Sequence, residues 1–136
     1  MAAFNKYDSG AEALVEGINA GTDVWAVILS NTAPAVTDVA QADAAELTTT
    51  GGYTVNGNTC AVSSSTNTGG VYKLVLASPT AWTGSGAGFT VRYAILHNRT
   101  NDKLIGWWDY TSSQLVALNE TFTVTLDGSG GVFTVT

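Results

Sequence analysis

The feature that most constrains the fold is a pair of apolar segments, residues 89–97 and 103–110, separated by the polar residues 98–102. Two strand-length segments joined by a short polar connection predict an antiparallel β-hairpin. Both faces of this hairpin are largely apolar, so we expect it to be central, with one face covered by a second sheet and the other by a neighbouring subunit. The facing pairs predicted for a five-residue loop are Tyr93 with Trp107, Ile95 with Ile105 and Arg92 with Trp108.

Two further segments have the pattern of strands. Residues 24–30 form an uninterrupted apolar run, which is typical of a strand buried on both faces. Residues 71–76 alternate, with Lys73 on the face opposite to Tyr72 and Leu74. Both segments therefore predict strands that contribute to a core.

Turn residues and alternation predict two more hairpins. Asn56-Gly57 is a strong two-residue turn signal, and it would place Tyr53 opposite Cys60. Near the C-terminus, apolar residues alternate with threonine over 121–126 and again over 133–136. A tight turn between these two segments would bring both apolar sets to one face.

One short helix is expected near the N-terminus. Ser9 and Glu12 fit the capping-box pattern S-x-x-E. Leu14 and Ile18 lie on one face of such a helix, and Gly21 would end it. The alanine-rich residues 38–47 fit either a second helical turn or a long ordered loop.

Seven or eight short strands separated by Gly, Ser and Asn turns predict a single all-β domain over residues 1–136, with a sandwich or jelly-roll architecture. A chain of 136 residues is long enough for one domain with its own core. Charged residues make up only 12% of the chain, and its 20 threonines are expected to supply polar outer faces.

Acidic residues outnumber basic ones by eleven to five, which gives a formal net charge of −6. This balance argues against nucleic-acid binding, which depends on basic residues that neutralise phosphates. Residues 1–46 carry a net charge of −6, residues 47–101 carry +3 and residues 102–136 carry −3. The distribution is either scatter in a small sample or a sign that an acidic edge of one copy meets a basic edge of the next.

Few side chains could carry chemistry. His97 is the only histidine and Cys60 the only cysteine, so an intramolecular disulfide and sites with several Cys or His ligands are excluded. We expect His97 to be exposed beside the polar loop and Cys60 to be a buried structural thiol. Asp109 is better explained by backbone hydrogen bonds or by pairing with Arg92 than as a glycosidase acid, which needs a second carboxylate. The sequence predicts no catalytic residue, no cofactor, no metal site and no enzymatic activity.

Adjacent Trp107 and Trp108 must point to opposite faces of a strand, so only one of them can belong to the central core. The other would stack on a sugar, lie in a subunit interface or be covered by a local loop. Residues 1–8 are expected to form an N-terminal arm that docks on a neighbour. The predicted interface residues are Phe4, Tyr7, Arg92, Trp108 and Tyr110.

The N-terminal residues lack the basic and apolar regions of a secretory signal. No apolar run reaches the roughly 20 residues that span a bilayer. We therefore expect synthesis in a cytoplasm without export, and no contact with a membrane.

Segments spread over nearly the whole chain resemble a family of small virion structural proteins of tailed bacteriophages. These segments are Phe4–Asp8, Leu29–Pro34, Gly52–Thr54, Tyr72–Pro79 with Trp82, Arg92–Leu96 and Leu104–Tyr110. The resemblance implies a β-sandwich that coats or cements a capsid in many copies and has no active-site residues. It implies a location in the virion, with the major capsid protein and further copies of the chain as partners and a trimer favoured.

The tryptophans leave a different class of function open. A carbohydrate-binding module or an adhesin-like sandwich would use Trp82, Trp107 or Trp108 as a stacking platform for a glycan. A hydrolase that uses Asp109 is a third alternative.

Overall fold

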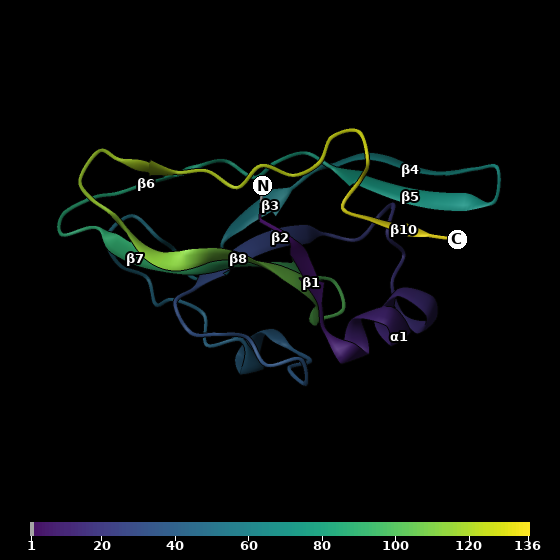
Figure 1. The fold of residues 1–136 in the computed structure, drawn as a ribbon, viewed down its shortest axis with the longest axis horizontal. Coiled ribbons are helices and arrows are strands. Elements are labelled where there is room, and N and C mark those ends of the chain that lie inside the picture. The colour runs from purple at the N-terminus through teal and green to yellow at the C-terminus, as the bar shows by residue number, and fades with distance from the viewer. Residues whose placement is uncertain (1) are drawn as a thin grey trace.

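The computed structural model describes residues 2–136 and contains ten strands and one α-helix (Figure 1). In chain order the elements are β1 Phe4–Lys6, α1 Asp8–Glu16, β2 Trp25–Ser30, a 3₁₀ turn at Gln41–Asp43, β3 Asn58–Cys60, β4 Val62–Thr68, β5 Val71–Leu76, β6 Trp82–Thr83, β7 Phe89–Asn98, β8 Lys103–Val116, β9 Thr121–Phe122 and β10 Phe133–Val135. The prediction of an all-β domain with one short helix is confirmed. No helix in residues 2–136 has the length and apolar character needed to cross a bilayer.

The strands form three antiparallel sheets with the orders β1-β8-β7-β2-β3, β10-β5-β4 and β6-β9. Figure 1 shows the five-stranded sheet in the middle of the molecule, with β4, β5, β6 and β10 in a layer over one face. Helix α1 and the connection from β2 to β3 lie on the other side. The architecture is therefore sandwich-like, with a partial third layer.

Strand β2 lies inside the five-stranded sheet, as its uninterrupted apolar sequence predicts. All six of its side chains are buried. Trp25, Val27 and Leu29 belong to the main core between the two sheet layers, whereas Ile28 belongs to a second cluster on the opposite face. A strand covered on both faces needs apolar residues at successive positions, which explains the run.

The chain itself covers the outer face of the central sheet, where a neighbouring subunit was expected. The second cluster consists of Tyr7, Ile28, Ala44, Ile95 and Leu104, and half-buried Trp107 packs against it. Ala44 lies in the connection from β2 to β3, and Tyr7 precedes α1. Trp107 and Trp108 do point to opposite faces, and a local segment covers Trp107 while Trp108 joins the main core.

The central hairpin forms between β7 and β8, but its register differs from the prediction. The loop has four residues, 99–102, and the pairing shifts at two irregular positions further along the strands. The observed pairs include Ile95 with Trp107, Ala94 with Trp108 and Tyr93 with Asp109, so the pairs Tyr93–Trp107, Ile95–Ile105 and Arg92–Trp108 are wrong. The shift between Leu96 and His97 inserts one extra residue in β8 and the shift between Val91 and Tyr93 inserts three, which a uniform alternation does not contain.

The hairpin predicted at Asn56-Gly57 does not form. The N–H of Gly57 donates to the carbonyl of Thr54, so a turn is present. However, Cys60 does not pair with Tyr53, because β3 adds to the edge of the central sheet and Cys60 pairs with Trp25. The turn therefore directs the chain onto the edge of the central sheet instead of folding it back on itself.

The predicted C-terminal hairpin is also wrong. Strand β9 pairs with β6, and β10 pairs with β5. The alternation itself is confirmed over 121–126, where the apolar side chains are buried and the threonines exposed. It fails at Val135, which is exposed.

Helix α1 begins at Asp8, with Tyr7 at the N-cap and no side chain capping it. Ser9 therefore lies inside the first turn, while the side chain of Glu12 lies outside the described residues. The helix ends at Glu16 with Gly17 as C-cap, and not at Gly21.

Candidate interaction surface

The N-terminal residues form strand β1 at the edge of the central sheet. Phe4 pairs with Trp108 and Lys6 with Gly106. The Phe4 ring lies over Gly106, and a Cβ atom added at Gly106 would come within 2.1 Å of Cζ of Phe4. The centroid of the Phe4 ring is 4.9 Å from that of Trp108. Residues 4–6 thus dock on their own sheet, where a free arm was expected, and Met1 lies outside the described residues.

Two of the predicted interface residues are buried within the chain. Tyr7 is 0% exposed, and its ring centroid lies 4.6 Å from that of Trp107. Burial, with a smaller contribution from Asp38, raises the pKa of Tyr7. Trp108 is 6% exposed. Neither Tyr7 nor Trp108 is accessible to a partner in this structure.

Arg92 and Asp109 form an ion pair across β7 and β8. Arg92 donates from Nε and Nη2 to the two carboxylate oxygens of Asp109 at 2.9 and 3.0 Å, and the N–H of Thr111 donates to the same carboxylate at 2.8 Å. The guanidinium of Arg92 holds the pKa of Asp109 below its usual range. The prediction that Asp109 pairs with Arg92 is confirmed. The next residue, Tyr110, packs edge-on against Phe122 with ring centroids 5.1 Å apart.

His97 is buried, with only 2% of its surface exposed, so the expectation of an exposed histidine is wrong. Its Nε2 lies 2.9 Å from Oδ1 of Asp102, and its Nδ1 has no partner among the described residues. Burial lowers the pKa of His97 and so favours the neutral ring. The hydrogen bond and charge of Asp102 act in the opposite direction but are the smaller effect. Asp102 also accepts the N–H of Gln41, so this contact ties the covering loop to the hairpin end.

Cys60 is buried in β3, as predicted, with 4% of its surface exposed. Burial raises the pKa of its thiol to about 12. A thiol that stays protonated is a poor nucleophile and a poor metal ligand. Within residues 2–136, no three His, Cys, Asp or Glu side chains are grouped in a way that could hold a metal ion.

Four residues, Gln41, Glu46, Asn56 and Arg99, join the β2–β3 connection to the hairpin end, and we call them the loop clasp. The carboxylate of Glu46 accepts Gln41 Nε2 at 2.6 Å, the N–H of Asn56 at 2.7 Å and the hydroxyl of Tyr53. Arg99 donates to the carbonyl oxygens of Asn56 and Gly57. These polar side chains therefore position a loop.

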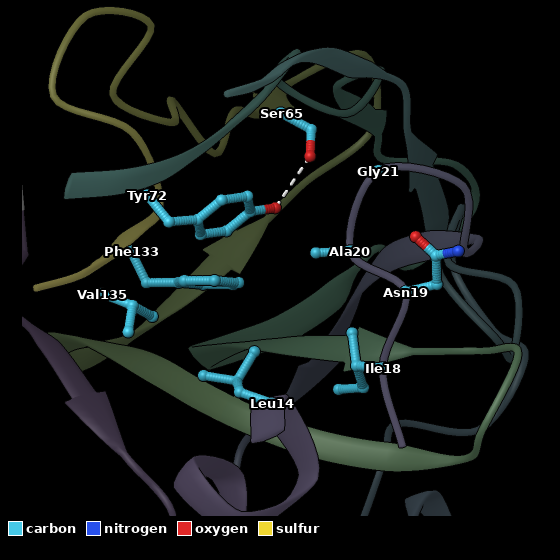
Figure 2. A pocket seen from close by; sticks show the side chains of 9 residues that line it. All are labelled: Leu14, Ile18, Asn19, Ala20, Gly21, Ser65, Tyr72, Phe133 and Val135. Carbon is cyan, nitrogen blue, oxygen red and sulfur yellow. Dashed lines mark hydrogen bonds between the residues drawn. The ribbon is translucent and has the colours of Figure 1, made fainter. Parts of the chain in front are cut away.

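An open groove of about 450 Å³ lies between the end of α1 and the second sheet layer (Figure 2). It is lined by Leu14, Ile18, Asn19, Ala20, Gly21, Ser65, Tyr72, Phe133 and Val135. Figure 2 shows Leu14 and Ile18 on the side of α1, facing Tyr72 and Phe133 from β5 and β10. The lining is mostly apolar, so the groove can bury an apolar or aromatic side chain.

The polar groups of the groove are few. The hydroxyl of Tyr72 lies 2.9 Å from Oγ of Ser65, and Asn19 stands at the rim (Figure 2). The centroid of the Phe133 ring lies 6.4 Å from that of Tyr72 and 6.0 Å from that of Trp25, which belongs to the main core. The groove thus opens directly onto the main core.

Sequence reasoning missed the groove, although part of its signal was present. The helical stripe of Leu14 and Ile18 and the alternation around Tyr72 were both visible in the sequence. The groove forms only because β10 lies beside β5, a pairing that the assumed C-terminal hairpin excluded.

The three bases of residues 47–101 do not form one basic edge. Arg92 pairs with Asp109, Arg99 belongs to the loop clasp, and Lys73 donates to the carbonyl of Ser129 at 2.8 Å. Each base therefore meets a partner on its own chain. This arrangement gives no support to an acidic edge that meets a basic edge of the next copy.

Comparison with protein-family models, with curated proteins and with solved structures finds no match to this chain.

Proposed function

We propose that this chain is a non-enzymatic structural protein of a tailed-bacteriophage particle, a decoration protein that binds the outer capsid shell in many copies. The proposed partners are the major capsid protein and further copies of the chain, arranged as a trimer. The segments that resemble such proteins lie largely in the framework of the fold: Tyr72–Pro79 overlaps β5, Arg92–Leu96 lies in β7 and Leu104–Tyr110 lies in β8.

One observation carries the proposal: the polar side chains bind other parts of the same chain, whereas the open groove is an apolar surface that nothing in residues 2–136 fills. Within the described residues, His97, Asp109 and Glu46 contact other parts of the chain and hold its strands and loops in place. The open groove, by contrast, offers an apolar surface next to the C-terminal strand. Apolar surface rimmed by polar residues is typical of protein-binding sites, so the groove favours a function in binding another protein.

Cosedimentation with isolated capsid shells of the phage that carries this sequence tests the proposal. Val135→Asp places a charge at the rim of the groove, at a position that is already 48% exposed. Leu118→Asp, at a residue 58% exposed on the connection from β8 to β9, is the matched control. We expect the wild type and the control to pellet with shells, and the affinity of Val135→Asp to fall by about tenfold or more, equivalent to about 1.4 kcal/mol.

Failure of the wild type to bind shells would overturn the decoration function. Equal binding by Val135→Asp and the wild type would place the contact outside the groove. The mass of the protein in solution, measured by light scattering, tests the trimer separately.

Glycan binding is the second candidate, because the groove combines aromatic rings with hydroxyl groups. Of the three tryptophans expected to form a stacking platform, Trp82 and Trp108 are buried and Trp107 is half-buried against the second cluster, and none of them lines the groove. Tyr72 and Phe133 occupy the groove instead, beside Ser65. Calorimetric binding of a glycan that disappears in Tyr72→Ala would favour this function over decoration.

A further inference from the structure

The fold imposes the dipeptide Asn56-Gly57 at the turn before β3. Asn56 has φ of 78° and Gly57 has φ of 59°, both in the left-handed region. A Cβ atom on Gly57 would lie 1.9 Å from the carbonyl oxygen of Val27, so only glycine fits there. Asparagine is one of the few side chains that tolerate the backbone conformation of position 56.

Asn-Gly is a chemically labile sequence, because glycine has no side chain to shield its amide nitrogen. That nitrogen loses its proton and attacks Cγ of the asparagine. The bond from Cγ to the side-chain nitrogen breaks, ammonia leaves and a five-membered succinimide remains. Water then opens the ring to give either aspartate or an isoaspartyl linkage, so the net reaction consumes one water and releases one ammonia.

The folded chain holds the groups that must move in this reaction. The N–H of Gly57 donates to the carbonyl of Thr54 at 3.1 Å. Oδ1 of Asn56 accepts Gln41 Nε2 at 2.9 Å, and the N–H of Asn56 donates to Glu46 at 2.7 Å. The attack needs freedom of the Asn56 side-chain amide, which the hydrogen bond from Gln41 restrains.

We propose that Asn56 is a deamidation site and that the loop clasp controls how fast it reacts. The hydrogen bond from Gln41 restrains the side-chain amide of Asn56 and the bond to Thr54 engages the Gly57 N–H, so we expect both bonds to slow the attack. Local opening of residues 41–46 releases the amide of Asn56, which is exposed to the water that completes the reaction.

The product weakens the clasp that protected the site. Gln41 Nε2 donates both to Oδ1 of Asn56 at 2.9 Å and to Oε2 of Glu46 at 2.6 Å, so these two oxygens are close neighbours. Deamidation turns the first of them into a carboxylate oxygen beside the second carboxylate. Like charges repel, so the modified chain opens its β2–β3 connection more readily than the unmodified chain.

The test compares deamidation rates in the full chain at mildly alkaline pH. Peptide mass spectrometry follows the conversion of the Asn56 amide to an acid in wild type, Gln41→Ala and Gln114→Ala. Gln114 is the matched control, because it is an exposed glutamine that lies on β8 outside the loop clasp. We expect Gln41→Ala to react several-fold faster than the wild type and Gln114→Ala to match it.

The wild type alone provides a second measurement, which does not depend on any variant folding. We expect it to react more slowly when folded than when unfolded in urea. Equal rates in those two states, or equal rates in folded wild type and Gln41→Ala, would overturn control by the clasp. Absence of modification at Asn56 in the urea-unfolded chain would overturn the site itself.

Discussion

The Nε2 atom of His97 lies 2.9 Å from Oδ1 of Asp102, and Asp102 in turn accepts the N–H of Gln41. The only histidine of the chain is thus buried at the contact between the central hairpin and the loop that covers the sheet. Its Nδ1 has no partner in residues 2–136, so a proton added there would be buried without an acceptor.

This burial predicts a loss of stability in mild acid. Burial lowers the pKa of His97 in the folded chain below the value of about 6.5 for an unfolded histidine. Stability is therefore fully present above about pH 6.5 and falls as the pH drops toward the folded pKa, because only the unfolded chain binds the proton, with a slope of at most about 1.4 kcal/mol per pH unit.

Urea unfolding at a series of pH values measures this effect, with His97→Gln as the comparison. The variant should lose the decline between about pH 6.5 and pH 5, whatever its overall stability. Carboxylates with lowered pKa values, Asp102 and Asp109 among them, lose their contribution at lower pH, so the two windows are separate. The same slope in wild type and variant would contradict the prediction.

Gly106→Ala should displace the Phe4 ring from the edge of the central sheet. The new Cβ would lie 2.1 Å from Phe4 Cζ and 2.4 Å from the carbonyl oxygen of Asn5, so both the ring and the backbone of β1 must shift away from β8. We expect a loss of about 1–3 kcal/mol in the free energy of unfolding. Gly128→Ala is the control, because a Cβ there meets nothing within 4 Å, and a similar loss in both variants would argue against displacement of the ring.

Two buried tyrosines should respond in opposite ways to loss of the hydroxyl. The Tyr53 hydroxyl donates to Glu46 and accepts a hydrogen bond from the buried N–H of Leu29. Tyr53→Phe leaves that N–H without its side-chain acceptor and should lower the free energy of unfolding by about 1–3 kcal/mol. The Tyr7 hydroxyl is buried without a partner in the described residues, so Tyr7→Phe should be neutral or stabilising. Thermal unfolding of both variants checks the contrast, which a larger loss in Tyr7→Phe would refute.

Cys60 should resist thiol reagents until the chain unfolds. Burial raises the pKa of its thiol to about 12, which leaves very little thiolate near neutral pH. A disulfide reagent should label wild type much faster in urea than in buffer. Ser112→Cys in a Cys60→Ala background provides an exposed thiol on β8 as the control. Equal labelling rates of the two thiols in buffer would contradict the prediction.

The sequence predicted features that depend on neighbours within one segment. The apolar run at 24–30 predicted a strand buried on both faces, which the structure forms over Trp25–Ser30, and adjacent Trp107 and Trp108 were placed on opposite faces. The alternation of Phe122, Val124 and Leu126 with threonine gave the correct buried side. These features follow from the period of two residues along a strand, which is a local property.

The register of the central hairpin could not be predicted in this way, because it depends on bulges and on the length of the loop. A four-residue loop and the register shift between Leu96 and His97 brought Ile95 opposite Trp107, and no propensity in the sequence marks that shift. The candidate site shows the same limit, since Tyr72 and Phe133 are far apart in the chain and meet only through the pairing of β5 with β10.

The sequence by itself thus determined that this chain is all-β, that the segments of β2, β5, β7 and β8 are strands, and which side of the 121–126 segment is apolar. The tertiary structure alone decided the partners of each strand, the burial of His97 and Tyr7 beneath chain segments, and the groove beside the C-terminal strand. The physical reason is that strand pairing and loop cover depend on which sheet edges and faces remain free after the rest of the chain has packed, and single-sequence patterns do not contain that information.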